Sequence, residues 1–346
     1  MLVLGIETSC DETAVGIVAD GRRMLANVIA SQAEIHARYG GVVPEVASRH
    51  HIEAMLPVVK AALIEAKCKP SDLDAVAVTA GPGLAGSLLV GLNTAKALAY
   101  SWSKPLIGVN HLEGHMYANW LSDAGETPAL PAVVLIVSGG HSELVWAESH
   151  GNYRLLGRTR DDAAGEAFDK AARILGLGFP GGPAIERAAR EAGPKPPRLP
   201  RAWLGDSADF SFSGLKSAVG RYLEAGGDPR TPPEERRSAQ GPESATQLRA
   251  DIAAGFQTAV VDVLTKKTVA VAKAMGASCI LLSGGVAANG PLRASLREAA
   301  PMPLYVPPPV LCTDNGAMIA AAGHFRAESG LAALDLDVRA SWPIAG

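Results

Sequence analysis

The stretch LVLGIETSCDETAVGIVA, residues 2–19, decides the fold. Two runs of aliphatic, β-branched residues flank the polar turn ETSCDET, which is typical of two strands folded back on each other. The same pattern returns in AVVLIVSGGHSELVWA, residues 132–147, although the letters of the two copies differ. A hairpin with a small polar tip can direct successive backbone N–H groups at a phosphate. The pattern therefore predicts two similar halves, each with an anion-binding hairpin tip.

The chain continues as alternating strands and helices, which indicates an α/β layered fold. Strands are expected at residues 73–79, 105–109, 279–283 and 303–306, and helices at residues 45–67, 87–102, 162–175, 182–192, 248–275, after 290 and from 315. A length of 346 residues exceeds the usual size of a single core, so two domains or a duplicated one are expected. Residues 193–247 hold eight prolines, which favours loops or a poorly ordered insertion.

Composition and charge narrow the function classes. The formal net charge of −3 is not the basic footprint of a protein that binds nucleic acid unaided. For an RNA substrate, the positive surface must be local or come from a partner. The four cysteines form no C-x-x-C pair, so neither a zinc ribbon nor a disulfide framework is indicated. No signal peptide is recognisable and no apolar run reaches the ~18–20 residues of a membrane span, so we expect a cytoplasmic protein.

A histidine pair marks a candidate metal site. His111 and His115 stand four residues apart, directly after the expected strand at 105–109. On a helix, such residues lie on one face about 5–6 Å apart, and α/β proteins gather ligand sites at the carboxyl ends of strands. Gly114 leaves space beside the pair, and Asp314 offers a carboxylate where a loop meets a helix. These three side chains are predicted to bind one metal ion.

Two other motifs suggest different functions. GPGLAGS, residues 81–87, matches G-x-G-x-x-G, but the next strand ends in Asn110 and His111 instead of the acid that a dinucleotide site requires. Pro82 also removes one N–H group from the turn. The HLEGH stretch is not the H-E-x-x-H motif of zinc peptidases, because Glu113 points about 200° away from His111 at 100° per residue. A nicotinamide enzyme and a metallopeptidase are therefore the weaker alternatives.

Two glycine-rich stretches are candidate ligand loops. LLSGGVAANGPLR, residues 281–293, resembles the second-lobe nucleotide loops of actin-like ATPases, in which Asn289 can reach hydroxyl groups. DDAAGEAFDKAARILGLGFPGGP, residues 161–183, packs four acids and many glycines together. Asp169 and Gly182 can line a ligand pocket, or the acids can simply begin a solvated helix near its positive end. The spacing leaves both interpretations open.

Together these stretches resemble one family, the universal tRNA threonylcarbamoyltransferases of the actin-like ATPase superfamily. The matching segments, in chain order, are GIETSCDET, GGVVPEVASRHH, GPGLAGSLLVG, NHLEGHMYA, LIVSGGHSEL, DDAAGEAFDKAARILGLGFPGGP, DFSFSGLK, LSGGVAANGPLR and CTDNGAMIA. The resemblance implies an α/β fold of the actin-like, ribonuclease H-like type, with two similar lobes and a nucleotide and metal site in the cleft between them. The expected first lobe is 1–110 with 315–346, and the second is 111–314 with a polar insertion near 224–247.

The resemblance also implies an activity. The family transfers the threonylcarbamoyl group from threonylcarbamoyl-AMP to the exocyclic amine of the position-37 adenosine in tRNAs reading ANN codons, and AMP leaves. One divalent metal ion, Fe(II) or Zn(II), would be held by His111, His115 and Asp314. The residues that match the substrate pocket are Ile136, Val137, Ser138, Gly139, Gly140, Asp169, Gly182, Glu186 and Asn289.

Asp11 and Glu12, at the tip of the first hairpin, are our candidates for accepting or orienting the amine proton; they can equally cap the turn. Other functions stay open at this point. An ATPase or sugar kinase of the same fold would have no use for the histidine pair, and a non-catalytic scaffold would have no need of the metal. Besides tRNA, the resemblance implies a paralogous actin-like partner and a small ATPase, and no membrane.

Overall fold

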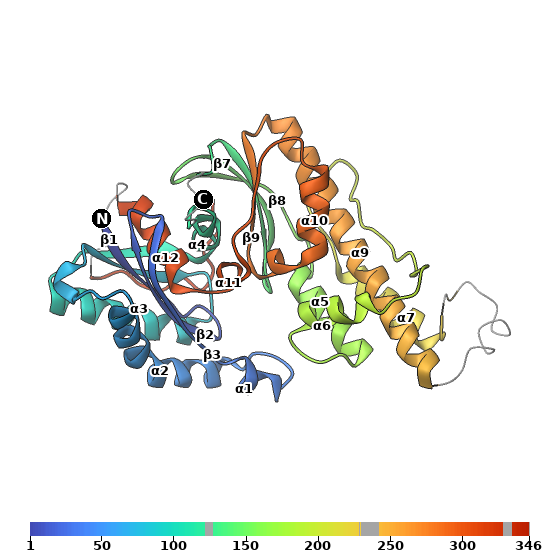
Figure 1. Ribbon diagram of the computed structural model, residues 1–346, viewed down its shortest axis with the longest axis horizontal. Coiled ribbons are helices and arrows are strands. Elements are labelled where there is room, and N and C mark those ends of the chain that lie inside the picture. The colour runs from blue at the N-terminus through green and yellow to red at the C-terminus, as the bar shows by residue number, and fades with distance from the viewer. Residues whose placement is uncertain (122–126, 228, 230–241, 328–333, 346) are drawn as a thin grey trace.

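The computed structural model describes residues 1–121, 127–227, 229, 242–327 and 334–345, and it contains two five-stranded sheets (Figure 1). Each sheet begins as a three-stranded antiparallel meander and continues with two parallel strands. The first has the order β3-β2-β1-β4-β5, and the second repeats it as β8-β7-β6-β9-β10. The strands are β1 (Leu2–Glu7), β2 (Glu12–Ala19), β3 (Arg23–Ser31), β4 (Ala75–Gly81), β5 (Leu106–Asn110), β6 (Ala132–Val137), β7 (Ser142–Ser149), β8 (Asn152–Arg158), β9 (Cys279–Ser283) and β10 (Leu304–Tyr305).

The repeated hairpin pattern is confirmed, since β1–β2 and β6–β7 occupy equivalent places in the two sheets. The third strand of each meander, β3 and β8, was not expected. Both are edge strands whose side chains are mostly exposed or half-buried. An edge strand of this kind lacks the continuous apolar run that identifies a strand buried on both faces.

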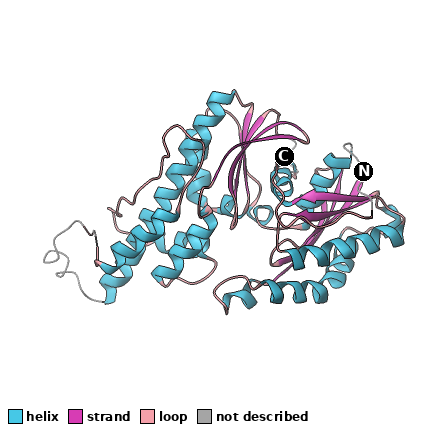
Figure 2. Cartoon of the chain, turned by 180° about the vertical axis from the view of Figure 1, so that it is seen from behind, coloured by secondary structure: helices cyan, strands magenta, loops and turns pink. Residues whose placement is uncertain are grey.

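Helices cover the outer face of each sheet and also fill the space between the sheets, as Figure 2 shows. The helices are α1 (Ala33–Ala37), α2 (Pro44–Glu65), α3 (Ala85–Trp102), α4 (His111–Tyr117), α5 (Ala164–Leu175), α6 (Gly181–Arg190), α7 (Ser213–Glu224), α9 (Pro242–Met275), α10 (Gly290–Ala299), α11 (Pro309–Cys312) and α12 (Gly316–Arg326). Between α2 with α3 and the first sheet lies one apolar core, and between the second sheet and α5, α7, α9 and α10 lies another.

A third, central core joins the two sheets through α4 and α12. Successive side chains of a strand point to opposite faces, so β6 serves two cores at once. Val134 and Ile136 enter the central core, whereas Val133, Leu135 and Val137 enter the outer one. The central layer is therefore where residues from both halves of the chain meet.

The helix α12 lies unusually close to the first hairpin. A Cβ atom built on Gly16 would stand 2.1 Å from the backbone N of Ala317, and one on Gly316 would stand 2.0 Å from the N of Gly16. Only glycine allows backbones to approach this closely. This contact fixes the start of α12, and hence the position of Asp314 just before it.

Two sequence expectations change in detail. The helix expected at 248–275 begins at Pro242, so the end of the 224–247 insertion is helical; residues 228 and 230–241 of that insertion lie outside the described residues. The lobe division 1–110 with 315–346 and 111–314 stays a proposal, which the packing of α12 against β1, β2 and β4 of the first sheet supports. Among the described helices, none combines the length and apolar character that a membrane crossing requires.

The contact between α12 and the first hairpin makes a prediction about stability. Gly16→Ala should lower the free energy of unfolding by about 1–3 kcal/mol, because overpacking forces backbones apart. Gly220→Ala, within α7 and with open space around its Cβ, is the matched control and should stabilise slightly by helix propensity. Denaturant unfolding of both variants measures the difference. Equal stability of Gly16→Ala and wild type would show that α12 can shift at no cost.

Candidate active site and metal centre

Three side chains converge in the central layer, as the sequence predicted. His111 and His115 project from one face of α4, and their ring centroids are 4.6 Å apart. Asp314 Oδ1 lies 3.6 Å from His111 Nε2 and 3.2 Å from His115 Nε2. One possible ligand atom from each of the three falls within 4.8 Å of the others. Two elements far apart in the chain thus build one compact donor set.

The His111 ring is oriented from behind by the first hairpin. Its Nδ1 lies 3.0 Å from Glu7 Oε2 and 3.1 Å from Ser9 Oγ, and Thr79 donates a 2.6 Å hydrogen bond to the same Glu7 oxygen. Burial opposes charge on His111, but Glu7 and Asp314 together raise its pKa above the ordinary value. A carboxylate on the rear nitrogen is a common support for a metal-binding histidine, because it fixes the tautomer. Glu7 therefore leaves Nε2 directed at Asp314.

The neighbouring His115 tests whether these residues suit a metal. It is 1% exposed, and within the described part of the chain neither of its ring nitrogens makes a hydrogen bond of acceptable geometry. A buried polar atom left unpaired costs about 1–3 kcal/mol, and a cation shared with Asp314 would satisfy Nε2. Two imidazole nitrogens and one carboxylate suit iron or zinc equally. The donor set therefore fits a divalent metal ion.

Glu113 points away from the metal donors, as the helical spacing predicted. Its carboxylate is 2% exposed and forms a 2.5 Å ion pair with Arg326 of α12. A zinc peptidase needs its glutamate beside the metal, whereas this one ties α4 to α12. Burial raises the pKa of Glu113, and Arg326 opposes that shift.

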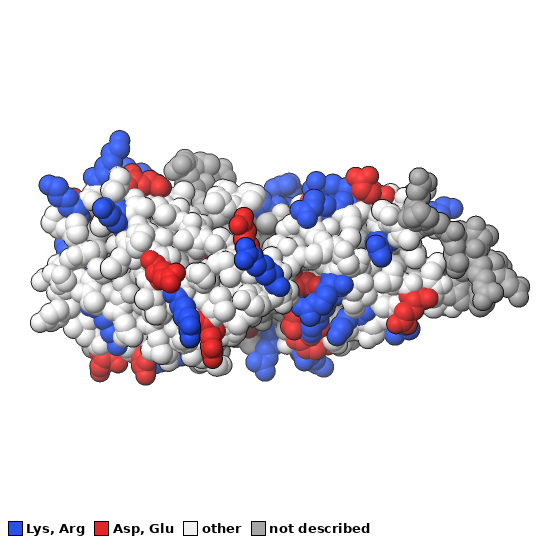
Figure 3. Space-filling model, turned by 90° about the horizontal axis from the view of Figure 1, so that it is seen from below, with Lys and Arg blue, Asp and Glu red and all other residues white. Residues whose placement is uncertain are grey.

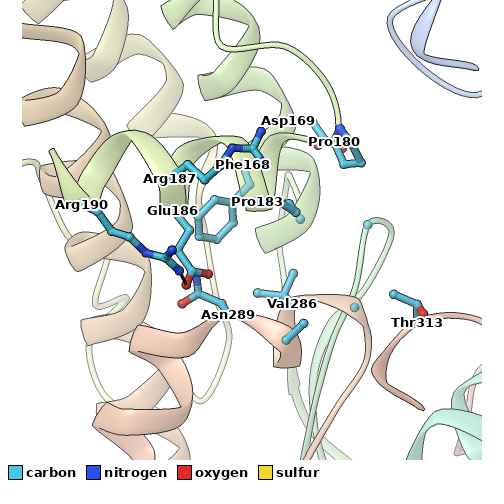
Figure 4. A pocket seen from close by; sticks show the side chains of 15 residues that line it. Phe168, Asp169, Pro180, Pro183, Glu186, Arg187, Arg190, Val286, Asn289 and Thr313 are labelled. Carbon is cyan, nitrogen blue, oxygen red and sulfur yellow. Dashed lines mark hydrogen bonds and ion pairs between the residues drawn. The ribbon is translucent and has the colours of Figure 1, made fainter. Parts of the chain in front are cut away.

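A cavity of about 560 Å³ is lined by residues of α5 and α6, by Asn289 and by Thr313 (Figure 4). Its volume lies in the range of small-molecule sites. Five of the predicted substrate residues line it: Gly139, Asp169, Gly182, Glu186 and Asn289. Ten further lining residues were not predicted: Gly165, Phe168, Pro180, Pro183, Arg187, Arg190, Gly285, Val286, Ala288 and Thr313. One of these lining residues, Thr313, directly precedes the metal donor Asp314 in the chain.

The polar residues of this cavity are held by their neighbours. Asp169 accepts a 2.7 Å bond from the backbone N of Gly181 at the start of α6. Glu186 is paired with Arg190 at 2.8 Å. Asn289 caps α10 through its amide oxygen, and its amide nitrogen bonds Gln257 Oε1 at 3.0 Å. The pocket is thus preorganised, with an aromatic and proline-lined wall and a charged rim.

The remaining predicted substrate residues belong to the second hairpin. Ile136 and Val137 are fully buried in β6, so their side chains face the two cores and not the cavity. Ser138 begins the tip, where its backbone N bonds the carbonyl of His141 at 2.8 Å. Gly140 lines a second cavity, of about 520 Å³, on the other side of this tip. Their part in binding stays a prediction.

The two predicted carboxylates of the first hairpin differ in setting. Asp11 is half-buried in the turn, and Glu12 begins β2. Ser31 donates a 2.8 Å hydrogen bond to Glu12 Oε1, whereas Oε2 is buried with no partner among the described residues. Burial raises the pKa of Glu12 to about 7, although the Ser31 bond opposes the shift. A carboxyl with that pKa can exchange a proton near neutral pH.

The G-x-G-x-x-G stretch is filled by protein. A Cβ on Gly83 would stand 2.6 Å from the carbonyl oxygen of Ser9, and Leu84 N donates a 2.8 Å bond to that oxygen. A Cβ on Gly86 would meet Ser48 Oγ at 2.7 Å. These glycines allow the turn before α3 to pack on the first hairpin and on α2, which is a structural role.

Sequence reasoning missed His141, at the tip of the second hairpin. Burial lowers its pKa to about 4, and the neighbouring His111 and His115 act in the same direction. The neutral form of the His141 imidazole is therefore favoured, and this side chain lines a cavity at the hairpin tip. A single histidine in SGGH has no paired spacing to mark it, and only the sheet topology brings it near α4.

Comparison with solved structures defines the class. The chain is similar to component A of the (R)-2-hydroxyglutaryl-CoA dehydratase of Acidaminococcus fermentans, with 16% identity, a TM-score of 0.52, and 95% of this chain and 99% of that one covered. It is also similar to HypF of T. kodakarensis, with 15% identity, a TM-score of 0.60, and 95% and 48% covered. At these identities the likeness shows the fold alone. The protein has the actin-like ATPase fold, as expected.

Comparison with sequences defines the family. Residues 23–321 match the family model described as tRNA N6-adenosine threonylcarbamoyltransferase. Proteins of that name from Thermomicrobium roseum and Bacillus subtilis are 58% and 51% identical, over 99% and 96% of this chain and 97% and 92% of their own lengths. The chain belongs to the tRNA N6-adenosine threonylcarbamoyltransferase family. It is an enzyme of the transferase class, which confirms the resemblance seen in the sequence.

The donor set makes a prediction about metal content. His115→Ala should lose most of the bound iron or zinc, because it removes a nitrogen from a three-residue site. His50→Ala is the matched control, since this histidine is half-buried on α2, lies 3.7 Å from Glu53 and is not among the metal donors. Elemental analysis of purified variants, with circular dichroism to verify folding, measures the effect. Unchanged metal in a folded His115→Ala protein would place the metal elsewhere.

Proposed function

We propose that the protein transfers the threonylcarbamoyl group from threonylcarbamoyl-AMP to the exocyclic amine of the position-37 adenosine in tRNAs reading ANN codons, with release of AMP. One observation carries this proposal: the lining of a nucleotide-sized cavity includes Thr313, the residue before Asp314, and Asp314 forms a compact donor set with two buried histidines. This supports donor binding and charge stabilisation in the same cleft. A plain ATPase or kinase of this fold would have no use for buried histidines in that cleft.

The chemistry has one demanding step. The adenine amine is a weak nucleophile because its lone pair is delocalised into the ring. A bond forms between this nitrogen and the carbamoyl carbon, the bond from that carbon to the phosphate oxygen breaks, and AMP leaves with the electron pair. The amine proton goes to a base. Asp11 or Glu12 is our candidate, and the raised pKa of Glu12 suits a group that takes up a proton near neutral pH.

We assign the metal to His111, His115 and Asp314, with Fe(II) or Zn(II) as the ion. When bound, it would supply positive charge that stabilises the oxygens of the donor as they gain negative charge. The chain's own contribution is preorganisation. Glu7 orients His111, Thr79 and Ser9 orient Glu7, and no rearrangement of α4 is needed.

We assign donor recognition to the residues of the 560 Å³ cavity. Phe168 and Val286 offer apolar surface to a purine, and Asp169, Glu186 and Asn289 offer polar atoms to hydroxyl and amine groups. Gly139 and Gly182 have open space where a Cβ would stand, so backbone N–H groups there can approach the anionic parts of the donor. Arg187 and Arg190 add positive charge at the rim.

We further propose that the reaction takes place in the cytoplasm and with protein partners, among them a paralogous actin-like protein and a small ATPase.

On the face seen in Figure 3, basic and acidic side chains are interspersed, so tRNA contacts are local. Ile52 and Leu56, one turn apart on α2, are 66% and 64% exposed, which supports a protein partner at this helix.

A competition titration tests donor recognition. A non-hydrolysable analogue of threonylcarbamoyl-AMP should bind more tightly than ATP, because polar groups left unpaired by the wrong ligand cost about 1–3 kcal/mol each. Asp169→Ala should reduce the difference in affinity between the analogue and ATP. Asp162→Ala is the matched control, since Asp162 pairs with Lys170 and does not line the cavity. Equal affinity of the wild type for both ligands would favour an ATPase.

A further inference from the structure

A second cavity lies behind the tip of the β6–β7 hairpin. Its volume is about 520 Å³, close to that of the donor cavity. Gly139 lines the donor cavity, whereas the next residues, Gly140 to Glu143, line the second one. Its opposite wall is formed by the end of β8 and by Asp209. One hairpin tip therefore contributes to two cavities, and its Gly139 lines the donor cavity together with Thr313, the residue before Asp314.

Arginine dominates the second cavity. Arg160 is 58% exposed, and its Nε donates a 2.9 Å bond to Asp209 Oδ2, which engages one of its five N–H donors. Arg158 stands directly opposite Glu143 in the β7–β8 register. Lys267 of α9 is buried, bonds the carbonyl oxygen of Ser207 and does not line this cavity.

The two cavities differ in the ligand that they suit. Aromatic, proline and valine side chains line the donor cavity, and arginines and polar groups line the second. A group-transfer enzyme must bring its two substrates to one reacting centre in a fixed geometry. Here the acceptor is an RNA loop, whose phosphates are best matched by the planar guanidinium of arginine. Arg158 and Arg160 line this cavity together with Glu143 and Asp209, and the two guanidinium groups are its cationic groups that can meet a phosphate.

We propose that this second cavity is the acceptor side of the active site: Arg158 and Arg160 bind backbone phosphates of the tRNA anticodon loop, and the target adenosine reaches the metal donors past His141. The proposal rests on the transfer function proposed above. Glu143 and Asp209 hold the arginines in place and weaken the contact, which keeps a long RNA from binding too tightly to release.

Substitution of the arginines tests the proposal. Binding of a fluorescent anticodon stem-loop to the full-length protein is measured by anisotropy at several salt concentrations. Arg158→Ala with Arg160→Ala should weaken binding about ten-fold or more and make the slope of log K against log salt shallower by about one per lost phosphate contact. Arg154→Ala is the matched control, on the same strand but beside Met275 at a distance from the cavity, and should change neither quantity.

Removing the negative charge of a carboxylate in this cavity should change stem-loop affinity in the opposite direction. Glu143→Gln keeps the shape of the side chain but removes a negative charge, so it should tighten stem-loop binding. If Glu143 had only a structural role, Glu143→Gln would not tighten stem-loop binding. Affinity for the donor analogue should stay at the wild-type value in all these variants, because no altered residue lines the donor cavity.

The outcomes separate this proposal from the function that it rests on. If the double arginine variant binds the stem-loop like wild type while transfer persists, the acceptor site lies elsewhere and the function stands. The acceptor site would also lie elsewhere if Arg154→Ala weakened stem-loop binding as much as the double variant does, or if Glu143→Gln weakened that binding. If the wild type binds neither donor analogue nor stem-loop and makes no modified nucleoside, the function itself is wrong.

Discussion

The close backbone contact between α12 and the first hairpin is the constraint on which the rest of the site depends. Gly16 and Gly316 let the helix start against β2 without any side chain between them. Asp314 immediately precedes that helix, and α4 immediately follows β5 in the same sheet. The metal donors are thus placed by two backbone junctions, not by flexible loops. Rigid elements hold such constellations more accurately than loops do.

The site also concentrates charge where the fold is otherwise apolar. Glu7 and Glu113 are nearly fully buried, as are His111 and His115, and they lie around the core that joins the two sheets. Burying an uncompensated charge is costly. Arg326 compensates Glu113, and His111 compensates Glu7, whereas the ring nitrogens of His115, although 3.2 Å from Asp314, make no hydrogen bond of acceptable geometry among the described residues. A bound cation would complete this arrangement, so metal binding and the stability of the central layer are expected to be linked.

Much of this could be read from the sequence, for identifiable reasons. Buried strands with turn residues between them predicted β1–β2 and β6–β7, and helical spacing predicted that His111 and His115 share a face while Glu113 does not. Edge strands β3 and β8 carry too little apolar signal to be seen. The phenylalanine of the donor cavity, and His141 and the arginines of the second cavity, are brought to these cavities only by the tertiary fold. No local pattern could have grouped them.

Anomalous X-ray diffraction at the iron and zinc absorption edges, from crystals of metal-loaded protein, tests the central claim most directly. The claim is that one metal ion joins α4 to the start of α12 at the inner end of the donor cavity. The account predicts a single strong peak in contact with His111, His115 and Asp314, at the edge of whichever metal the protein carries. A peak at any other group of residues, or an unchanged peak in crystals of His115→Ala, would contradict it.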